Sequence, residues 1–107
     1  MALKVEKTND RGALRSILGK WLKPDVAEAI LGAPNIEFYA VSDDSDSKGL
    51  IVFRQILPQI AEIHLLLSTI GRRTEQVIWE ATLQMHAKGT QLFVAPIPKG
   101  HRALLRL

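Results

Sequence analysis

The most informative part of this sequence is residues 61–74, which read AEIHLLLSTIGRRT. The β-forming residues 61–67 predict a strand, and Ser68, Thr69 and Gly71 predict a turn after it. From Arg72 to Lys88 apolar residues recur at helical spacing, and a further strand is predicted over 91–97. This order of strand, helix and strand predicts a parallel crossover.

The segments around this unit predict a mixed sheet with helices on both faces. They predict, in chain order, a strand at 2–6, helices at 13–22 and 24–31, strands at 36–41 and 50–57 joined by a turn, and a last short helix at 100–107. The expected order is therefore β-α-α-β-β-β-α-β-α, in the α/β class. Trp21 and Trp79 lie within apolar helix patterns, so both are expected in the core.

Composition limits the classes of function. The 107 residues are 47% hydrophobic and fit one domain, 1–107, with a net charge of +3. The absence of cysteine excludes disulfides, a thiol nucleophile and cysteine-based zinc sites. No apolar run is long enough for a membrane helix and no signal peptide is evident, so a cytoplasmic rather than secreted protein is expected.

A candidate anion site lies at the predicted start of the helix that follows residues 61–67. A helix N-terminus offers unpaired N–H groups and the positive end of its dipole, and Arg72 and Arg73 add full charges there. Gly71 permits close approach of the backbone, so Gly71, Arg72, Arg73 and Thr74 could hold a pyrophosphate. The alternative is a solvated turn in which Gly71 relieves strain.

The order of elements resembles the GNAT superfamily of acyl-CoA-dependent N-acetyltransferases. Residues 62–67 resemble the fourth strand of that family, 71–73 its pyrophosphate loop and 74–88 its central helix, and 93–104 resemble the strand and short helix that follow. The pattern is also similar to small GNAT-like proteins of bacteriophages, some of which are virion components. Two features depart from the family: Ser68 and Arg73 stand where its loop has Gln/Arg and Gly/Ala, and its two last strands are expected to be missing.

Glu62 and His64 are the candidate catalytic residues. They lie two positions apart, on one face of the predicted strand, beside the cleft that the resemblance implies. A neutral imidazole can take a proton from an amine near neutral pH, and a carboxylate can do so directly or through water. The alternative is that Glu62 forms a structural salt bridge and His64 a structural hydrogen bond. The three histidines show no metal-ligand spacing, so no metal is expected.

Two functions remain open at this point. The first is a non-catalytic structural or interaction subunit on a GNAT-like fold, such as a virion component, with no cofactor. The alternative is an N-acetyltransferase that uses acetyl-CoA.

The expected partner is another protein or a second copy of the chain. It would bind the C-terminal edge through Arg102, Leu104, Leu105, Arg106 and Leu107. Residues 72–107 hold six Lys or Arg and two Glu, but no aromatic residues interleave these charges as in a nucleic-acid reader.

The substituted loop position gives a first prediction. If residues 71–73 hold a pyrophosphate, Arg73→Gly should preserve or improve the affinity for acetyl-CoA, because it removes a bulky side chain from the backbone's approach. Calorimetric titration of the wild type and the variant measures this. Strong binding by the wild type that is lost in Arg73→Gly would show that Arg73 contributes to binding instead of obstructing it.

Overall fold

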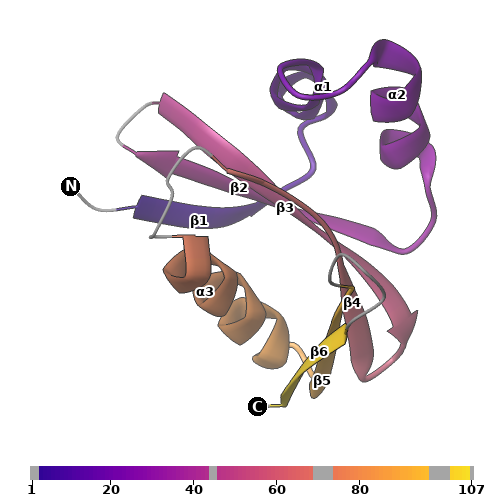
Figure 1. Cartoon of the computed structure of the whole chain (residues 1–107), viewed down its shortest axis with the longest axis vertical. Helices are drawn as coiled ribbons and strands as arrows, with labels where there is room; N and C mark the ends of the chain where they lie inside the picture. Colours follow the sequence, from indigo (N-terminus) through magenta and orange to yellow (C-terminus); the bar gives the residue numbers. More distant parts are fainter. Residues whose placement is uncertain (1–2, 44–45, 69–73, 97–101, 107) are drawn as a thin grey trace.

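The computed structural model describes residues 3–43, 46–68, 74–96 and 102–106, and shows a twisted sheet between helices (Figure 1). The elements are β1 (Leu3–Thr8), α1 (Arg11–Gly19), α2 (Pro24–Gly32), β2 (Ile36–Asp43), β3 (Asp46–Leu57), β4 (Ile60–Ser68), α3 (Thr74–His86), β5 (Leu92–Pro96) and β6 (Arg102–Arg106). None of the helices in these ranges is both long and apolar enough to cross a membrane.

The strands are ordered β1-β2-β3-β4-β5-β6 across the sheet. All neighbours are antiparallel except β4 and β5, which are parallel and connected through α3. The mixed sheet and the parallel strand-helix-strand unit predicted from residues 61–97 are therefore confirmed.

The last element corrects the sequence prediction. Residues 102–106 form β6, which pairs antiparallel with β5 from Leu92↔Arg106 to Pro96↔Arg102. The predictions of a helix here and of a sheet ending at β5 are therefore wrong. A helix this short is unstable on its own in water, whereas the open edge of β5 supplies a partner for the N–H and C=O groups of the chain.

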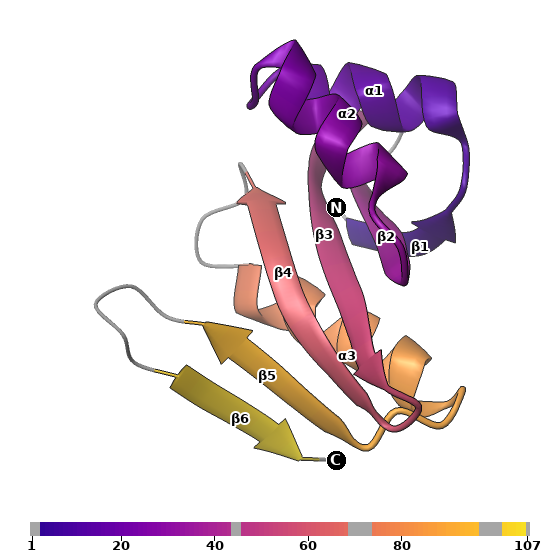
Figure 2. The same ribbon diagram turned by 90° about the vertical axis from the view of Figure 1, so that its right-hand side faces the viewer.

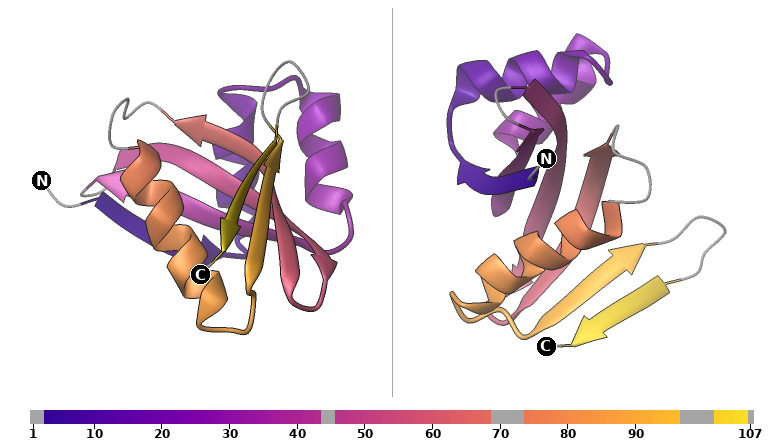
Figure 3. Two further views of the ribbon diagram at one scale, coloured as in Figure 1. Left: turned by 60° about the horizontal axis from the view of Figure 1, so that its bottom comes forward. Right: turned by 90° about the vertical axis from the view of Figure 1, so that its left-hand side faces the viewer.

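Alternating side chains place one apolar cluster on each face of the sheet. Figure 3 shows the helices that cover the two faces, α3 on one and α1 and α2 on the other. One cluster lies under α3 and combines Val77, Ala81 and Met85 of that helix with strand residues such as Phe53 and Phe93. The other lies under α1 and α2 and joins Leu14, Leu18 and Leu31 to Phe38, Leu50 and Val52. Because both faces are covered, β2 and β3 contain nearly continuous apolar runs.

Local signals in the sequence account for the helix ends. The Asp10 side chain accepts a hydrogen bond from the backbone N–H of Ala13, which caps α1. Pro24 occupies the first turn of α2, as predicted. After α3, Gly89 has a φ of 112°, and the N–H groups of Gly89 and Thr90 donate to the carbonyls of His86 and Met85. This pair of bonds is a Schellman motif, which explains why a glycine ends the helix.

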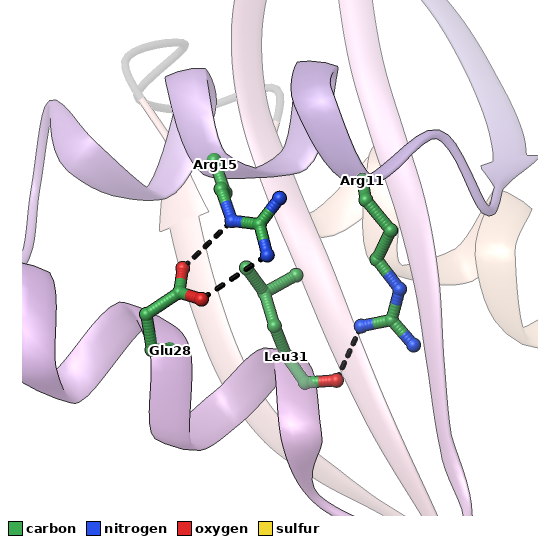
Figure 4. Close-up of polar contacts among 4 residues, drawn as sticks. All are labelled: Arg11, Arg15, Glu28 and Leu31. Atoms are coloured by element: carbon green, nitrogen blue, oxygen red, sulfur yellow. Dashed lines mark hydrogen bonds and ion pairs between the residues drawn. The ribbon is translucent and has the colours of Figure 1, made fainter.

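Polar contacts attach α1 to α2 (Figure 4). The Arg15 guanidinium donates to both carboxylate oxygens of Glu28, and Arg11 donates to the Leu31 carbonyl in the last turn of α2. The Glu28 carboxylate raises the pKa of Arg15, but both side chains are more than half exposed, so the pair contributes little to stability. The contacts of Arg11 and Arg15 join the two helices that cover this face.

The two tryptophans are a second correction. Trp21 is 42% exposed and Trp79 is 47% exposed, so neither is a core residue as predicted. The side of α3 that packs on the sheet carries Val77, Ala81 and Met85, and Trp79 lies outside that stripe with Leu83. The apolar stripe of α3 is wider than the side of the helix that contacts the sheet, so the residues at its margin, Trp79 and Leu83, stay exposed to solvent.

Tyr39 is fully buried in β2, and no group within the described ranges accepts a hydrogen bond from its hydroxyl or donates one to it. Its ring packs edge-on against Phe53 under α3. Burial raises the pKa of Tyr39, and the nearby Glu37 carboxylate raises it further, while Lys7 lowers it. The folded chain therefore holds the phenolic proton more tightly than the unfolded chain does.

We predict that Tyr39→Phe stabilises the fold by about 1 kcal/mol, because it removes a buried hydroxyl without a partner and keeps the ring. An unfolded tyrosine ionises near pH 10, so wild-type stability should fall as the pH rises above about 10 toward the raised folded pKa. Urea unfolding at neutral and alkaline pH measures both effects.

Tyr39 is the only tyrosine, so the absorbance of tyrosinate during an alkaline titration reports its ionisation directly. A titration at the ordinary tyrosine pKa in the folded protein, or a less stable Tyr39→Phe, would contradict this account.

Candidate active site

The strands β4 and β5 part at their carboxyl ends. They pair only through Ile60↔Leu92, Ala61↔Phe93 and Glu62↔Val94, although β4 continues to Ser68. On its other edge β4 stays paired with β3 as far as Gly49↔Ser68. Figure 2 shows the two strands diverging beyond their paired ends. From Ile63 to Ser68, the edge of β4 that faced β5 therefore has no strand bonded to it within the described chain.

An inserted residue, His64, marks the place where the strands part. In the pairing of β3 with β4, Phe53 is opposite Ile63 and Val52 is opposite Leu65, so His64 has no partner across the ladder. The side-chain alternation changes at the same point: Ile63 packs under α3, but Leu65 packs under α1 and α2. His64 is thus the extra residue of a β-bulge, a feature that bends a strand and increases its twist.

Glu62 is the last β4 residue paired with β5, and its carboxylate is held by two side chains. Its Oε1 atom lies 3.2 Å from a guanidinium nitrogen of Arg54 and 3.4 Å from Nδ1 of His64. The Glu62 side chain is 12% exposed, whereas Arg54 is 49% exposed and His64 40% exposed. The structure therefore brings the two predicted catalytic residues together and adds an arginine that the sequence analysis missed.

An open pocket of about 380 Å³ lies next to this group. Residues 33–36, from the end of α2 to the start of β2, line it together with Arg54, Gln55, Ile56 and His64. Asn35 has a φ of 60°, a conformation that asparagine tolerates better than most residues, and its carbonyl accepts the Gln55 backbone N–H at 2.8 Å. The pocket volume is within the range of small-molecule sites.

The predicted pyrophosphate-binding residues are only partly described. Gly71, Arg72 and Arg73 lie outside the described residues, and Thr74 is the first residue of α3. Of the predicted interface residues, Arg102, Leu104, Leu105 and Arg106 belong to β6 and Leu107 lies outside the description. Their contact with a partner remains a prediction. No group of three His, Asp or Glu side chains suited to a metal ion occurs in the described ranges.

The sequence holds one signal for Arg54. It is the only charged residue in the apolar run from Leu50 to Leu57, and Pro58 and Gln59 predict a tight turn to the next strand. A regular two-residue hairpin would place Arg54 opposite Ile63, and the register shift between Gln55 and Leu57 places it opposite Glu62 instead. No local residue pattern predicts this shift or the bulge at His64.

Comparison with solved structures identifies the fold. The ribosomal-protein-alanine N-acetyltransferase of Brucella melitensis superimposes with a TM-score of 0.69 at 15% identity, over 92% of this chain and 82% of that one. A Bacillus subtilis acetyltransferase in complex with CoA gives 0.68 at 17% identity, over 88% of this chain and 64% of that one. A GNAT family acetyltransferase from Elizabethkingia anophelis with acetyl-CoA bound gives 0.65 at 13%, over 87% and 63%.

The chain has the GNAT fold. No protein-family model matches the sequence, and no curated protein matches it either. The chain spans less than two thirds of two of the GNAT structures compared above. The resemblance based on the order of elements is thus confirmed for the fold, while the closer likeness to bacteriophage proteins and a virion role receives no support.

The expectation that no cofactor is involved is contradicted. Two of the GNAT structures with this fold contain CoA or acetyl-CoA, so the fold that was recognised is one that binds acyl-CoA. The prediction rested on the substituted loop at Ser68 and Arg73 and on the strands expected to be missing after residues 91–97, and one strand, β6, does follow there.

Proposed function

We propose that this chain is an N-acetyltransferase that uses acetyl-CoA. The observation that carries the proposal is the parting of β4 and β5 directly after Glu62↔Val94, with a largely buried carboxylate at that point. The fold similarity supports the same conclusion, since solved acetyltransferases share this arrangement of strands. The function itself rests on the site, because one fold can carry several activities.

The edges of the parted strands suit an acyl-CoA. From Ile63 to Ser68, one edge of β4 offers backbone N–H and C=O groups without a strand partner in the described chain. An elongated ligand that contains amide groups can pair with such an edge as a strand would. The N-terminus of α3 begins six residues after β4 ends, and residues 71–73 between them carry the sequence features of an anion site.

Glu62 and His64 are suited to proton transfer. If Nδ1 of His64 donates its proton to Oε1 of Glu62, the carboxylate fixes the tautomer in which Nε2 is the acceptor. His64 borders the pocket, whereas Glu62 is largely buried, so the imidazole is the group that a bound amine can reach. Glu62 then stabilises the imidazolium that forms when His64 takes the proton.

The chemistry balances with one base. A bound thioester supplies an activated acyl carbon. The amine nitrogen bonds to the carbonyl carbon and the carbon–sulfur bond breaks, with its electron pair going to sulfur. An ammonium ion loses two protons when it is acetylated: His64 accepts one, and the other goes to the departing sulfur, which leaves as a thiol. His64 then returns its proton to solvent.

Binding and chemistry can be tested separately. Calorimetric titration with acetyl-CoA should give a dissociation constant below about 1 mM for the wild type and for His64→Gln, because His64 is assigned to proton transfer alone. Release of free thiol from acetyl-CoA, measured with small amines as acceptors, should fall about 100-fold or more in His64→Gln.

His86→Gln is the matched control. His86 lies in the last turn of α3, with its Nδ1 2.9 Å from the Thr90 carbonyl and no contact with the pocket. This variant should keep the wild-type rate within about twofold. No acetyl-CoA binding at millimolar concentration would contradict the proposed function, and equal rates in His64→Gln and His86→Gln would contradict the role of His64.

A further inference from the structure

The pocket beside His64 indicates which kind of amine could accept the acetyl group. It lies on the sheet face that α1 and α2 cover, past the end of α2, and His64 belongs both to its wall and to the proposed proton-transfer pair. An amine bound in this pocket would therefore reach the base. The claim that a bound amine meets a catalytic base rests on the function proposed above. The charges of the residues that line the pocket do not depend on that function.

A cation is fixed in the pocket wall. Arg54 is half exposed, and its ion pair in the described part of the chain is with Glu62, through one guanidinium nitrogen at 3.2 Å. A guanidinium group has five N–H donors, so most of them remain for a ligand. Planar guanidinium groups bind carboxylates through two parallel hydrogen bonds. The pocket thus offers a carboxylate-binding group at its polar end.

The arginine and the base are close together because they share one anchor. The Arg54 nitrogen and Nδ1 of His64 both contact the same oxygen, Oε1 of Glu62. The two side chains therefore lie beside each other, and both line the pocket. An α-amino acid carries its amine and its carboxylate close together, which suits a base and a guanidinium that are neighbours.

Apolar side chains also line the pocket. Pro34 lies between α2 and β2, Ile36 is the first residue of β2, and Ile56 belongs to β3, where its side chain is 47% exposed despite its size. Burial of an exposed isoleucine by an apolar ligand group is favourable. A small ligand with its carboxylate at Arg54 could place an apolar side chain against these residues.

We propose that the pocket binds a small amino acid with an apolar side chain as the acetyl acceptor. Arg54 holds its carboxylate, His64 accepts the proton from its amine, and Ile36 and Ile56 contact its side chain. A polyamine is disfavoured, because it would place further positive charges beside Arg54 without a carboxylate to compensate them.

Three probes that differ in charge test this proposal on the whole chain. They are L-leucine, its carboxamide L-leucinamide and the polyamine spermidine. In calorimetric titrations without acetyl-CoA, L-leucine should bind at least about tenfold more tightly than L-leucinamide, and spermidine should not bind detectably. With acetyl-CoA present, thiol release should follow the same order.

Arg54→Gln and a matched control assign this preference to one side chain. Arg54→Gln should reduce the tenfold preference for L-leucine to about one, and Arg54→Lys should restore part of it. Arg15→Gln removes an equally exposed arginine of α1 that does not border this pocket, so it should keep the full preference. Thermal unfolding of each variant checks that the fold is intact.

The outcomes separate this inference from the proposed function. Equal binding of L-leucine and L-leucinamide, tighter binding of spermidine, or a preference that survives in Arg54→Gln would overturn the pocket assignment. Turnover of acetyl-CoA on spermidine alone would do so while leaving the acetyltransferase function in place. Arg54-dependent binding of L-leucine without any binding of acetyl-CoA would support the pocket and contradict the function.

Discussion

The arrangement of the site depends on the β-bulge at His64, where the pairing of β4 with β5 has ended. Upstream of it, β4 pairs with β3 on one edge and β5 on the other; downstream, it pairs with β3 alone. The same insertion moves Leu65 and Leu67 to the face under α1 and α2, where they complete the second apolar cluster. The bulge at His64 thus coincides with the parting of two strands, with an unpaired backbone edge in the described chain and with an imidazole beside a largely buried carboxylate.

Much of the fold was predictable from local patterns. The start of α2 at Pro24, the glycine that ends α3 and the alternation along the strands each depend on a few neighbouring residues. The strand β6 was not predictable in this way, since Ala103, Leu104 and Leu107 have helical spacing in the sequence. Pairing with the edge of β5 outweighs that weak helical preference, and this edge exists only in the assembled sheet.

The same distinction separates the predicted and the missed parts of the site. Glu62 and His64 were identified because they are polar residues two positions apart within an apolar strand. Arg54 contributes only through its register opposite Glu62, and the pocket requires α2, β3 and β4 to be in place. The exposure of Trp79 likewise depends on how wide a stripe of α3 the sheet can cover.

A short ladder between β5 and β4 joins the β5–β6 hairpin to the other four strands. Within the described residues, Leu92, Phe93 and Val94 pair with β4, and Phe93 is buried in the cluster under α3. The pairing with β4 is therefore confined to the first three residues of β5, whereas the pairing with β6 runs the length of that strand. Widening the gap beside β4 would break the pairings of one ladder and leave the ladders that join β1 to β4 intact.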